Sequence, residues 1–230
     1  AKMEFYEPEK ETEDVVLFSK FGMIGEFFLG RMVGGVFEGS RSPGFEHPDT
    51  LFRIKDMPLR LCTAVRVDST KTYRYVRYFG PRGGFGNVSE VGFYSSWADT
   101  EPLKGDILGP QEGAHGSHSY FNVFDGHTDT SYDHPFDYGG WAGLDLGEKK
   151  AIGKIVYTPR NRDNFVRKDD LYELLVCHGE EWKSAGTQVA QSDSLLFRNI
   201  PKHALLLLRD LSRGEAERLF EYKDGVQKYW

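Results

Sequence analysis

The sequence predicts an all-β protein, and three observations support this. Aromatic residues make up 14% of the chain, and there are 26 glycines. This composition suits pleated surfaces joined by tight turns. Short apolar or alternating runs recur along the chain, separated by Gly, Pro, Asn or Asp, and no long amphipathic helix is visible. The runs TAVRVD (63–68) and YRYVRY (73–78) alternate as strands with one solvated face do.

The other expected strands follow in chain order, and each is short and bounded by turn-forming residues. They are VVLFSKF (15–21), GEFFLGRMVGGVFEGS (25–40), VGFYSSW (91–97), WAGLDLG (141–147), AIGKIVYTP (151–159), LYELLVCHG (171–179), SLLFRNI (194–200) and HALLLLRDL (203–211). Only SRGEAERLF (212–220) offers a turn of helix.

The two halves of the chain echo each other. IGEFFLGR (24–31) is followed about 128 positions later by IGKIVYTPR (152–160), and a similar offset aligns Glu90 with Glu217. This predicts two copies of one β unit, at residues 1–100 and 101–230. The first copy is expected to have atypical or missing early strands, because FYEPEKETEDVV (5–16) is too charged for a core strand.

Charge and hydropathy exclude two classes of partner. The net charge of −6, with acidic residues spread along the chain, argues against binding to a phosphate backbone, which requires a basic face. No run of about 20 apolar residues is present, so we expect no membrane insertion. Cys62 and Cys177 lie in different halves and are expected to be unpaired, mostly buried thiols.

Motifs for catalysis are weak. With 35 carboxylates, acidic pairs are inevitable and do not indicate a glycosidase. HGSH (115–118) has two imidazoles but no nearby third ligand for zinc. Neither cysteine lies in a nucleophile motif, and neither G-x-S-x-G nor a phosphate-binding loop occurs. We therefore expect no enzyme activity and no catalytic residues.

Four stretches carry a family resemblance: VFDGHTDTSY (123–132), WAGLDLGEKKAIGKIVYTPR (141–160), LYELLVCHGEEW (171–182) and LLLLRDLSRGEAERLFEY (205–222). They resemble the discoidin family, the coagulation-factor type C domains and related carbohydrate-binding modules of galactose-binding-like fold. They are also similar to repeats in surface proteins of gut Bacteroidetes. The resemblance covers about 103–222, and its terminal half recurs over about 15–95.

The resemblance implies tandem galactose-binding-like jelly-roll β-sandwiches, each formed by two antiparallel sheets around a common core. Seven residues of the second copy are then expected in its core: Trp141, Leu144, Leu146, Ile155, Tyr172, Leu174 and Trp182.

The resemblance also implies a structural Ca²⁺ at the Asp-Gly turn, with Asp125, Thr130 and Glu217 as ligands. The sequence departs from the family pattern at His127, where Asp or Asn is usual, and an imidazole is a poor ligand for a hard cation. A second interpretation therefore stays open, in which Asp125 only caps its own turn.

Ligand contacts are expected at loops on one rim of the second copy. The loops DHPFDYGG (133–140), PRNRDNFVRKDD (159–170) and LSRGEAE (211–217) offer groups suited to sugar hydroxyls. The candidates are His134, Tyr138, Arg160, Asn161, Asn164 and Arg213. In a structural alternative, Arg160 pairs with Asp145 or Asp170. The matching loop of the first copy (30–49) carries Arg31, Arg41 and His47, and a spacer role is favoured there.

The sequence thus predicts a non-catalytic pair of carbohydrate-binding modules that belongs to an extracellular or cell-surface protein that processes glycans. The expected partners are a glycan or glycoconjugate and other domains of a larger chain. The alternative is a protein-interaction or spacer module that positions a missing catalytic domain. The residues do not specify the sugar or the oligomeric state.

Overall fold

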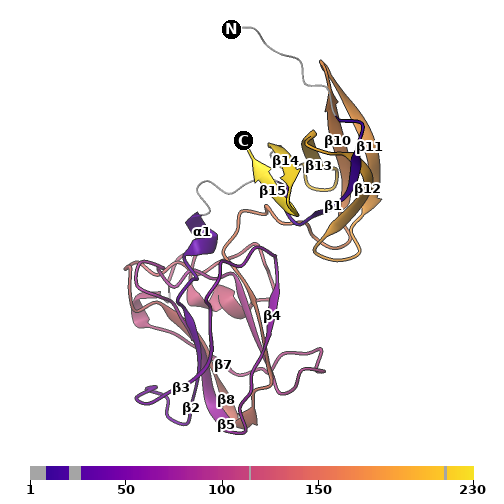
Figure 1. Cartoon of the computed structure of the whole chain (residues 1–230). Helices are drawn as coiled ribbons and strands as arrows, with labels where there is room; N and C mark the ends of the chain where they lie inside the picture. The colour runs from indigo at the N-terminus through magenta and orange to yellow at the C-terminus, as the bar shows by residue number, and fades with distance from the viewer. Residues whose placement is uncertain (1–8, 21–26, 114, 215–216) are drawn as a thin grey trace. The chain divides into compact units, whose positions relative to one another are not determined.

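A computed structural model describes residues 9–20, 27–113, 115–214 and 217–230 (Figure 1). The regular structure of the described chain is almost entirely β, which confirms the predicted all-β class. It forms two compact units. The central unit is Gly25–Arg162, and the terminal unit combines Ala1–Ile24 with Asp163–Trp230.

The central unit contains two antiparallel sheets. The five-stranded sheet has the order β3-β2-β5-β8-β7, and the three-stranded sheet has the order β4-β9-β6. The strands are β2 (Val36–Ser40), β3 (Asp49–Arg53), β4 (Thr63–Arg66), β5 (Thr72–Phe79), β6 (Glu90–Tyr94), β7 (Asp106–Leu108), β8 (Trp141–Ala151) and β9 (Lys154–Thr158).

One hydrophobic core fills the space between these sheets, so the central unit is a β-sandwich. Phe37 of the larger sheet has its ring centroid 6.2 Å from that of Phe93 and 5.3 Å from that of Tyr157, both on the smaller sheet. All three residues belong to the same buried cluster. Side chains alternate inward and outward along most of β5, as the sequence predicts for a strand with one solvated face, but Tyr75 and Val76 are both buried beside a register shift between Tyr73 and Tyr75.

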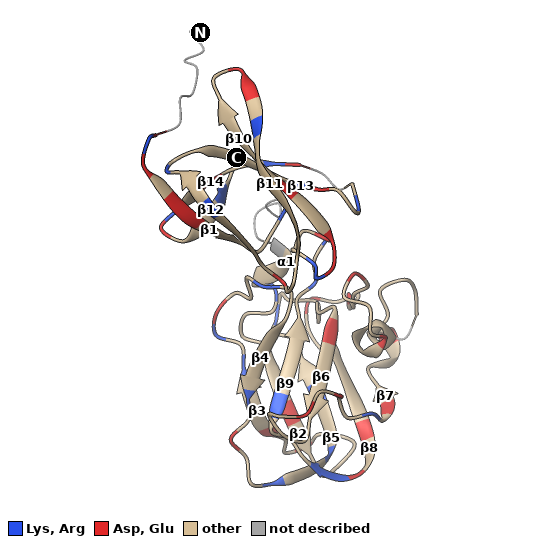
Figure 2. Ribbon diagram, turned by 90° about the vertical axis from the view of Figure 1, so that its right-hand side faces the viewer, with Lys and Arg blue, Asp and Glu red and all other residues tan. Residues whose placement is uncertain are grey.

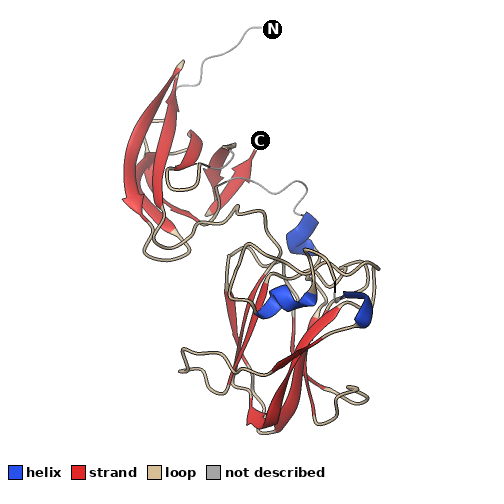
Figure 3. Ribbon diagram, turned by 180° about the vertical axis from the view of Figure 1, so that it is seen from behind, coloured by secondary structure: helices blue, strands red, loops and turns tan. Residues whose placement is uncertain are grey.

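The two ends of the sandwich differ. The segments α1 (Phe27–Gly30), η2 (Gln111–Gly113) and η3 (Tyr120–Phe124) gather at one end, which we call the helical end (Figure 3). The connection between β2 and β3 lies at the opposite end, the hairpin end (Figure 1). At the helical end, backbone atoms of three glycines lie close together: Gly80, Gly86 and Gly140. A Cβ on Gly80 would lie 2.7 Å from Cα of Gly86, so Gly80 accepts no side chain.

The terminal unit is built around a second core. Its five-stranded sheet has the order β11-β10-β13-β14-β15, and β1 pairs with β12. The strands are β1 (Thr12–Leu17), β10 (Leu171–His178), β11 (Glu181–Val189), β12 (Leu195–Pro201), β13 (Leu205–Asp210), β14 (Leu219–Lys223) and β15 (Val226–Tyr229). Contrary to expectation, β1 is a core strand. Side chains alternate along β1, so that Val15 and Leu17 are buried while the charged side chain of Asp14 is exposed.

A buried ion cluster holds the N-terminal segment to the rest of the terminal unit. The Lys20 side chain is 1% exposed, and its Nζ lies 3.0 Å from Asp210 Oδ2 and 3.2 Å from Asp163 Oδ2. Asp210 also accepts hydrogen bonds from the backbone N–H groups of Ser212 and Arg213. The lysine charge is therefore fully compensated although it lies away from water.

The expected boundary at residue 100 is wrong, because sheets of the central unit combine strands from both sides of it. β5 pairs with β8, and β6 pairs with β9. The expected repeat fails as well. The offset that aligns Glu90 with Glu217 matches the segment of β5 and β6 with that of β13 and β14, but β13 pairs with β14, whereas β5 and β6 lie in different sheets. Residues 27–30 form a helix where the supposed counterpart, 152–160, contains β9. Short strands separated by polar turns look alike in sequence whatever their pairing.

The expected core residues are mostly buried, although they divide between two cores. Leu144, Leu146 and Ile155 are buried in the central unit, and Tyr172 and Leu174 in the terminal unit.

The two tryptophans of that set differ from expectation. Trp141 is partly buried against Phe45, with ring centroids 5.8 Å apart. Trp182 is 39% exposed, because β11 forms the edge of its sheet and most of its side chains face solvent.

Charged residues of both signs are interspersed in each unit (Figure 2). In the described ranges no helix is long and apolar enough to span a membrane. Cys177 is buried as expected, but Cys62 is exposed, and the two form no disulfide.

Candidate functional site

The loop at residues 133–140, at the helical end of the sandwich, is fixed by its own polar groups. His134 is 4% exposed, and its backbone N–H donates to Phe85 O at 2.7 Å. Its ring Nδ1 accepts from the N–H of Phe136 at 3.2 Å. The N–H of Gly83 donates to Asp137 O at 2.6 Å. His134, which was predicted to contact a ligand, is therefore buried, and its hydrogen bonds stabilise the conformation of the loop.

Two aromatic rings project from this fixed loop. Phe136 is 53% exposed and Tyr138 is 57% exposed. The Arg82 guanidinium lies 5.1 Å from the centroid of the Tyr138 ring and 4.0 Å from the Asp137 carboxylate. We call Phe136, Tyr138 and Arg82 the aromatic platform. Large apolar side chains that are exposed to solvent on a well-ordered loop are typical of binding surfaces.

At the start of the same loop, the Asp133 carboxylate joins three segments of chain. Arg160 Nη1 donates a short hydrogen bond to it. Asn87 Nδ2 donates to the same carboxylate at 2.8 Å, and Arg31 Nη1 lies 3.9 Å from it. Burial lowers the pKa of the Arg31 guanidinium, an effect that the charge of Asp133 opposes. Arg160 thus pairs with an aspartate, although neither with Asp145 nor with Asp170 as considered above.

The remaining predicted ligand residues are also engaged within the protein. Asn161 is 6% exposed and donates from Nδ2 to Thr128 O and Pro159 O, both at 3.0 Å. Asn164 and Arg213 belong to the terminal unit, where Asn164 is buried and Arg213 binds Asp170 at 2.7 Å. The structure therefore does not gather the six predicted residues into one site, and of them only Tyr138 is both exposed and on the platform.

We expect Arg160→Ala to destabilise the central unit by about 1 to 3 kcal/mol, because it leaves Asp133 short of a charged partner in a half-buried site. The Arg160 side chain is 15% exposed and also covers the Phe28 ring at 4.4 Å. Arg82→Ala is the matched control, since that side chain is 77% exposed, and it should change stability by less than about 0.5 kcal/mol. Thermal denaturation compares the two variants; equal melting temperatures would contradict the structural role of Arg160.

The acidic turn at Asp125 lies at the same end of the sandwich. Asp125 Oδ1 accepts from the N–H of His127 at 2.8 Å, and Oδ2 accepts from Thr130 Oγ1 at 2.9 Å. Asp125 therefore caps its own turn, as one interpretation of the sequence expects. The N–H of Gly126 donates to Glu90 Oε1 at 2.7 Å, which brings a second carboxylate to the turn.

Glu90 was not predicted to belong to this site. Burial, then a hydrogen bond to Asp125, raises the pKa of Glu90 to about 8, with the charge of Asp125 adding to the shift. The predicted ligand Glu217 belongs instead to the terminal unit, where its carboxylate accepts from Arg209 Nε at 2.6 Å. The structure thus places Glu90, and not Glu217, beside the Asp125 turn.

Comparison with known proteins adds no relative: no family model, no curated protein and no solved structure matches the chain. Within the described ranges, no three side chains of His, Cys, Asp or Glu are grouped so as to hold a metal ion.

Proposed function

We propose that the central unit is a non-catalytic glycan-binding sandwich that receives its ligand on the aromatic platform. The observation that carries this proposal is the pair of exposed rings, Phe136 and Tyr138, on a loop held by the buried His134. Such a module serves an extracellular or cell-surface protein that captures or processes glycans.

The chemistry of the platform suits a sugar. One face of a pyranose presents C–H groups that pack on an aromatic ring, while its hydroxyls require donors and acceptors. Arg82 supplies donors and Asp137 supplies acceptors beside Tyr138, and both side chains reach solvent. Because the loop is already ordered, little conformational entropy is lost when a ligand binds.

We also propose a structural Ca²⁺ at the Asp125 turn, with Glu90 in place of Glu217. The donors that meet there are oxygens, from the carboxylates of Asp125 and Glu90 and the hydroxyl of Thr130, and oxygens are the ligands that Ca²⁺ prefers. Two carboxylates that share a hydrogen bond repel when both ionise, and a divalent cation would remove that repulsion. The ion would fix the turn that borders the platform loop.

One observation favours the alternative of a protein-interaction module for the terminal unit. Strand β11 forms the edge of its sheet and exposes two large apolar side chains, Trp182 at 39% and Val189 at 46%. An edge strand of this kind offers unpaired backbone groups to a partner strand. The two roles are compatible, since they use different units.

We expect Tyr138→Ala to weaken glycan binding by about 2 kcal/mol, or roughly thirty-fold, the loss typical of a central aromatic contact. A glycan array identifies the ligand, and affinity electrophoresis compares the variants. Phe121→Ala is the matched control, because Phe121 is also exposed, at 47%, but stacks on Tyr120 outside the platform. If both variants bind as the parent does, the platform is not the site. If the parent binds no glycan, the interaction module becomes the preferred function.

A further inference from the structure

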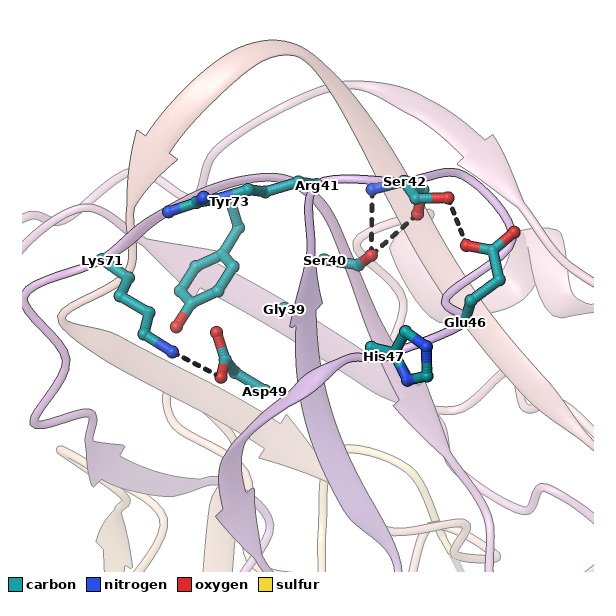
Figure 4. A pocket seen from close by; sticks show the side chains of 9 residues that line it. All are labelled: Gly39, Ser40, Arg41, Ser42, Glu46, His47, Asp49, Lys71 and Tyr73. Atoms are coloured by element: carbon teal, nitrogen blue, oxygen red, sulfur yellow. Dashed lines mark hydrogen bonds and ion pairs between the residues drawn. The ribbon is translucent and has the colours of Figure 1, made fainter.

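A pocket of about 420 Å³ opens at the hairpin end of the central unit, away from the aromatic platform (Figure 4). Its volume lies within the range of small-molecule sites, which is about 300 to 1,000 Å³. We call it the hairpin pocket. It is lined by Gly39, Ser40, Arg41, Ser42, Glu46, His47, Asp49, Lys71 and Tyr73.

The walls of the hairpin pocket are preorganised. Ser40 Oγ accepts from the N–H of Ser42 at 3.0 Å and donates to Ser42 O at 2.8 Å, so the chain leaves β2 in a fixed turn. Ser42 Oγ donates a short hydrogen bond to Glu46, which closes the loop on itself. A Cβ on Gly39 would lie 2.6 Å from the Tyr73 ring, so a glycine is needed for the ring to pack there.

The two cations of the hairpin pocket are engaged differently: Lys71 forms an ion pair with Asp49, whereas Arg41 acts on Asp49 through its charge, which helps to lower the pKa of that carboxyl. Lys71 Nζ binds Asp49 Oδ1 at 2.7 Å, and their hydrogen bond lowers the pKa of Asp49 and raises that of Lys71. Among the residues that the structure describes, Arg41 has no hydrogen-bonded or ion-paired partner. It extends toward the Lys71 side of the pocket, while His47 and Glu46 lie on the other side (Figure 4).

This arrangement distinguishes among ligands. A guanidinium binds a planar carboxylate through two parallel hydrogen bonds. The carboxylates of Asp49 and Glu46 are suited to accept hydrogen bonds from hydroxyl groups, and they would repel a dianion such as phosphate more strongly than a singly charged carboxylate. The site therefore fits a compact ligand that carries one carboxylate and several hydroxyls.

We propose that the hairpin pocket binds a sugar acid, a uronic acid residue whose carboxylate pairs with Arg41 and whose hydroxyls bind Asp49 and Glu46. This site is separate from the aromatic platform and does not rest on it. The ligand is either a free monosaccharide or one residue of an acidic polysaccharide, and the chemistry recognised is the same.

The test is a titration of the full chain, followed by NMR through the imidazole signals of His47. The probes are glucuronate, galacturonate, glucose, inorganic phosphate and a short oligogalacturonide. A uronate should bind and glucose should not, and Arg41→Ala should weaken uronate binding about tenfold or more. Tighter binding of the oligomer than of the monomer would identify a polysaccharide as the source, and equal affinity would identify the free sugar acid.

Arg53→Ala is the control for loss of a positive charge, because Arg53 is exposed, lies outside the pocket and donates to Gly34 O. It should leave uronate binding unchanged. The proposal is overturned if neither uronate binds the parent, if glucose or phosphate binds as tightly, or if Arg41→Ala and Arg53→Ala behave alike. Tyr138→Ala tests the platform separately, since it should not change monosaccharide uronate binding at the hairpin pocket.

Discussion

Lys20→Ala should lower the free energy of unfolding of the terminal unit by about 3 to 5 kcal/mol, the usual effect of removing one partner from a buried ion pair. The loss arises because Asp210, 1% exposed at its side chain, is left charged and away from water. Hydrogen exchange of the β13 amides in increasing urea measures this change within the terminal unit. Lys202→Ala is the control, since Lys202 is 40% exposed in its pair with Glu11, and it should cost no more than about 1 kcal/mol.

A double variant distinguishes the effect of an unpaired buried charge from the effect of lost side-chain packing. In Lys20→Met with Asp210→Asn, the buried charges of the pair are removed together, while the Asn oxygen can still accept from the N–H groups of Ser212 and Arg213. This variant should recover much of the stability that Lys20→Ala loses, because apolar or neutral replacements of buried pairs are well tolerated. Equal losses for Lys20→Ala and Lys202→Ala would show that the buried pair contributes no more than a surface pair.

Glu90→Gln should abolish two responses of the central unit, one to pH and one to Ca²⁺. In the metal-free protein the pKa of Glu90 is about 8, against 4.5 for an ordinary glutamate. The folded state therefore holds a proton that the unfolded state releases, so stability falls as pH rises from about 4.5 to about 8. Allowing for solvent screening of this half-buried group, we expect a loss of about 1 to 3 kcal/mol. The glutamine cannot ionise, so the loss should disappear.

Calcium should restore the stability that the wild-type protein loses at high pH, since the ion binds the ionised carboxylates of the native turn. The increase in melting temperature on adding Ca²⁺ should be larger at pH 8.5 than at pH 6, because binding at pH 6 must displace the proton of Glu90. Glu217→Gln, the control, should keep both responses, as Glu217 binds Arg209 in the terminal unit. A Ca²⁺ response that survives in Glu90→Gln, or is absent from the wild type, would leave Asp125 as a turn cap only.

The strands could be predicted from the sequence, but their partners could not. Alternation in YRYVRY correctly identifies β5, because the side-chain period of a strand is local. Pairing of β5 with β8 depends on turns, crossings and a shared core, which no local pattern encodes. The division into units followed from that pairing, and so a boundary at residue 100 was the natural error.

The sequence predicted the exposure of single residues better than it predicted which residues lie together. Tyr138 was expected at a rim and is exposed there. Asn161, on an equally polar loop, turns inward, because backbone carbonyls that need donors are not visible in sequence. The hairpin pocket was missed, although Arg41 and His47 were noted, because Lys71 and Tyr73 come from another part of the chain.

The pairing of β1 with β12 has a consequence for synthesis on the ribosome. Thr12 pairs with Pro201, so the first strand of the terminal unit emerges long before its partner. The central unit, whose residues are continuous, can fold in that interval as an independent domain. Until then, β1 carries apolar Val15 and Leu17 with no partner strand, the condition in which nascent chains recruit chaperones. Completion of the terminal unit is thus a late, nonlocal step that the C-terminal third of the polypeptide controls.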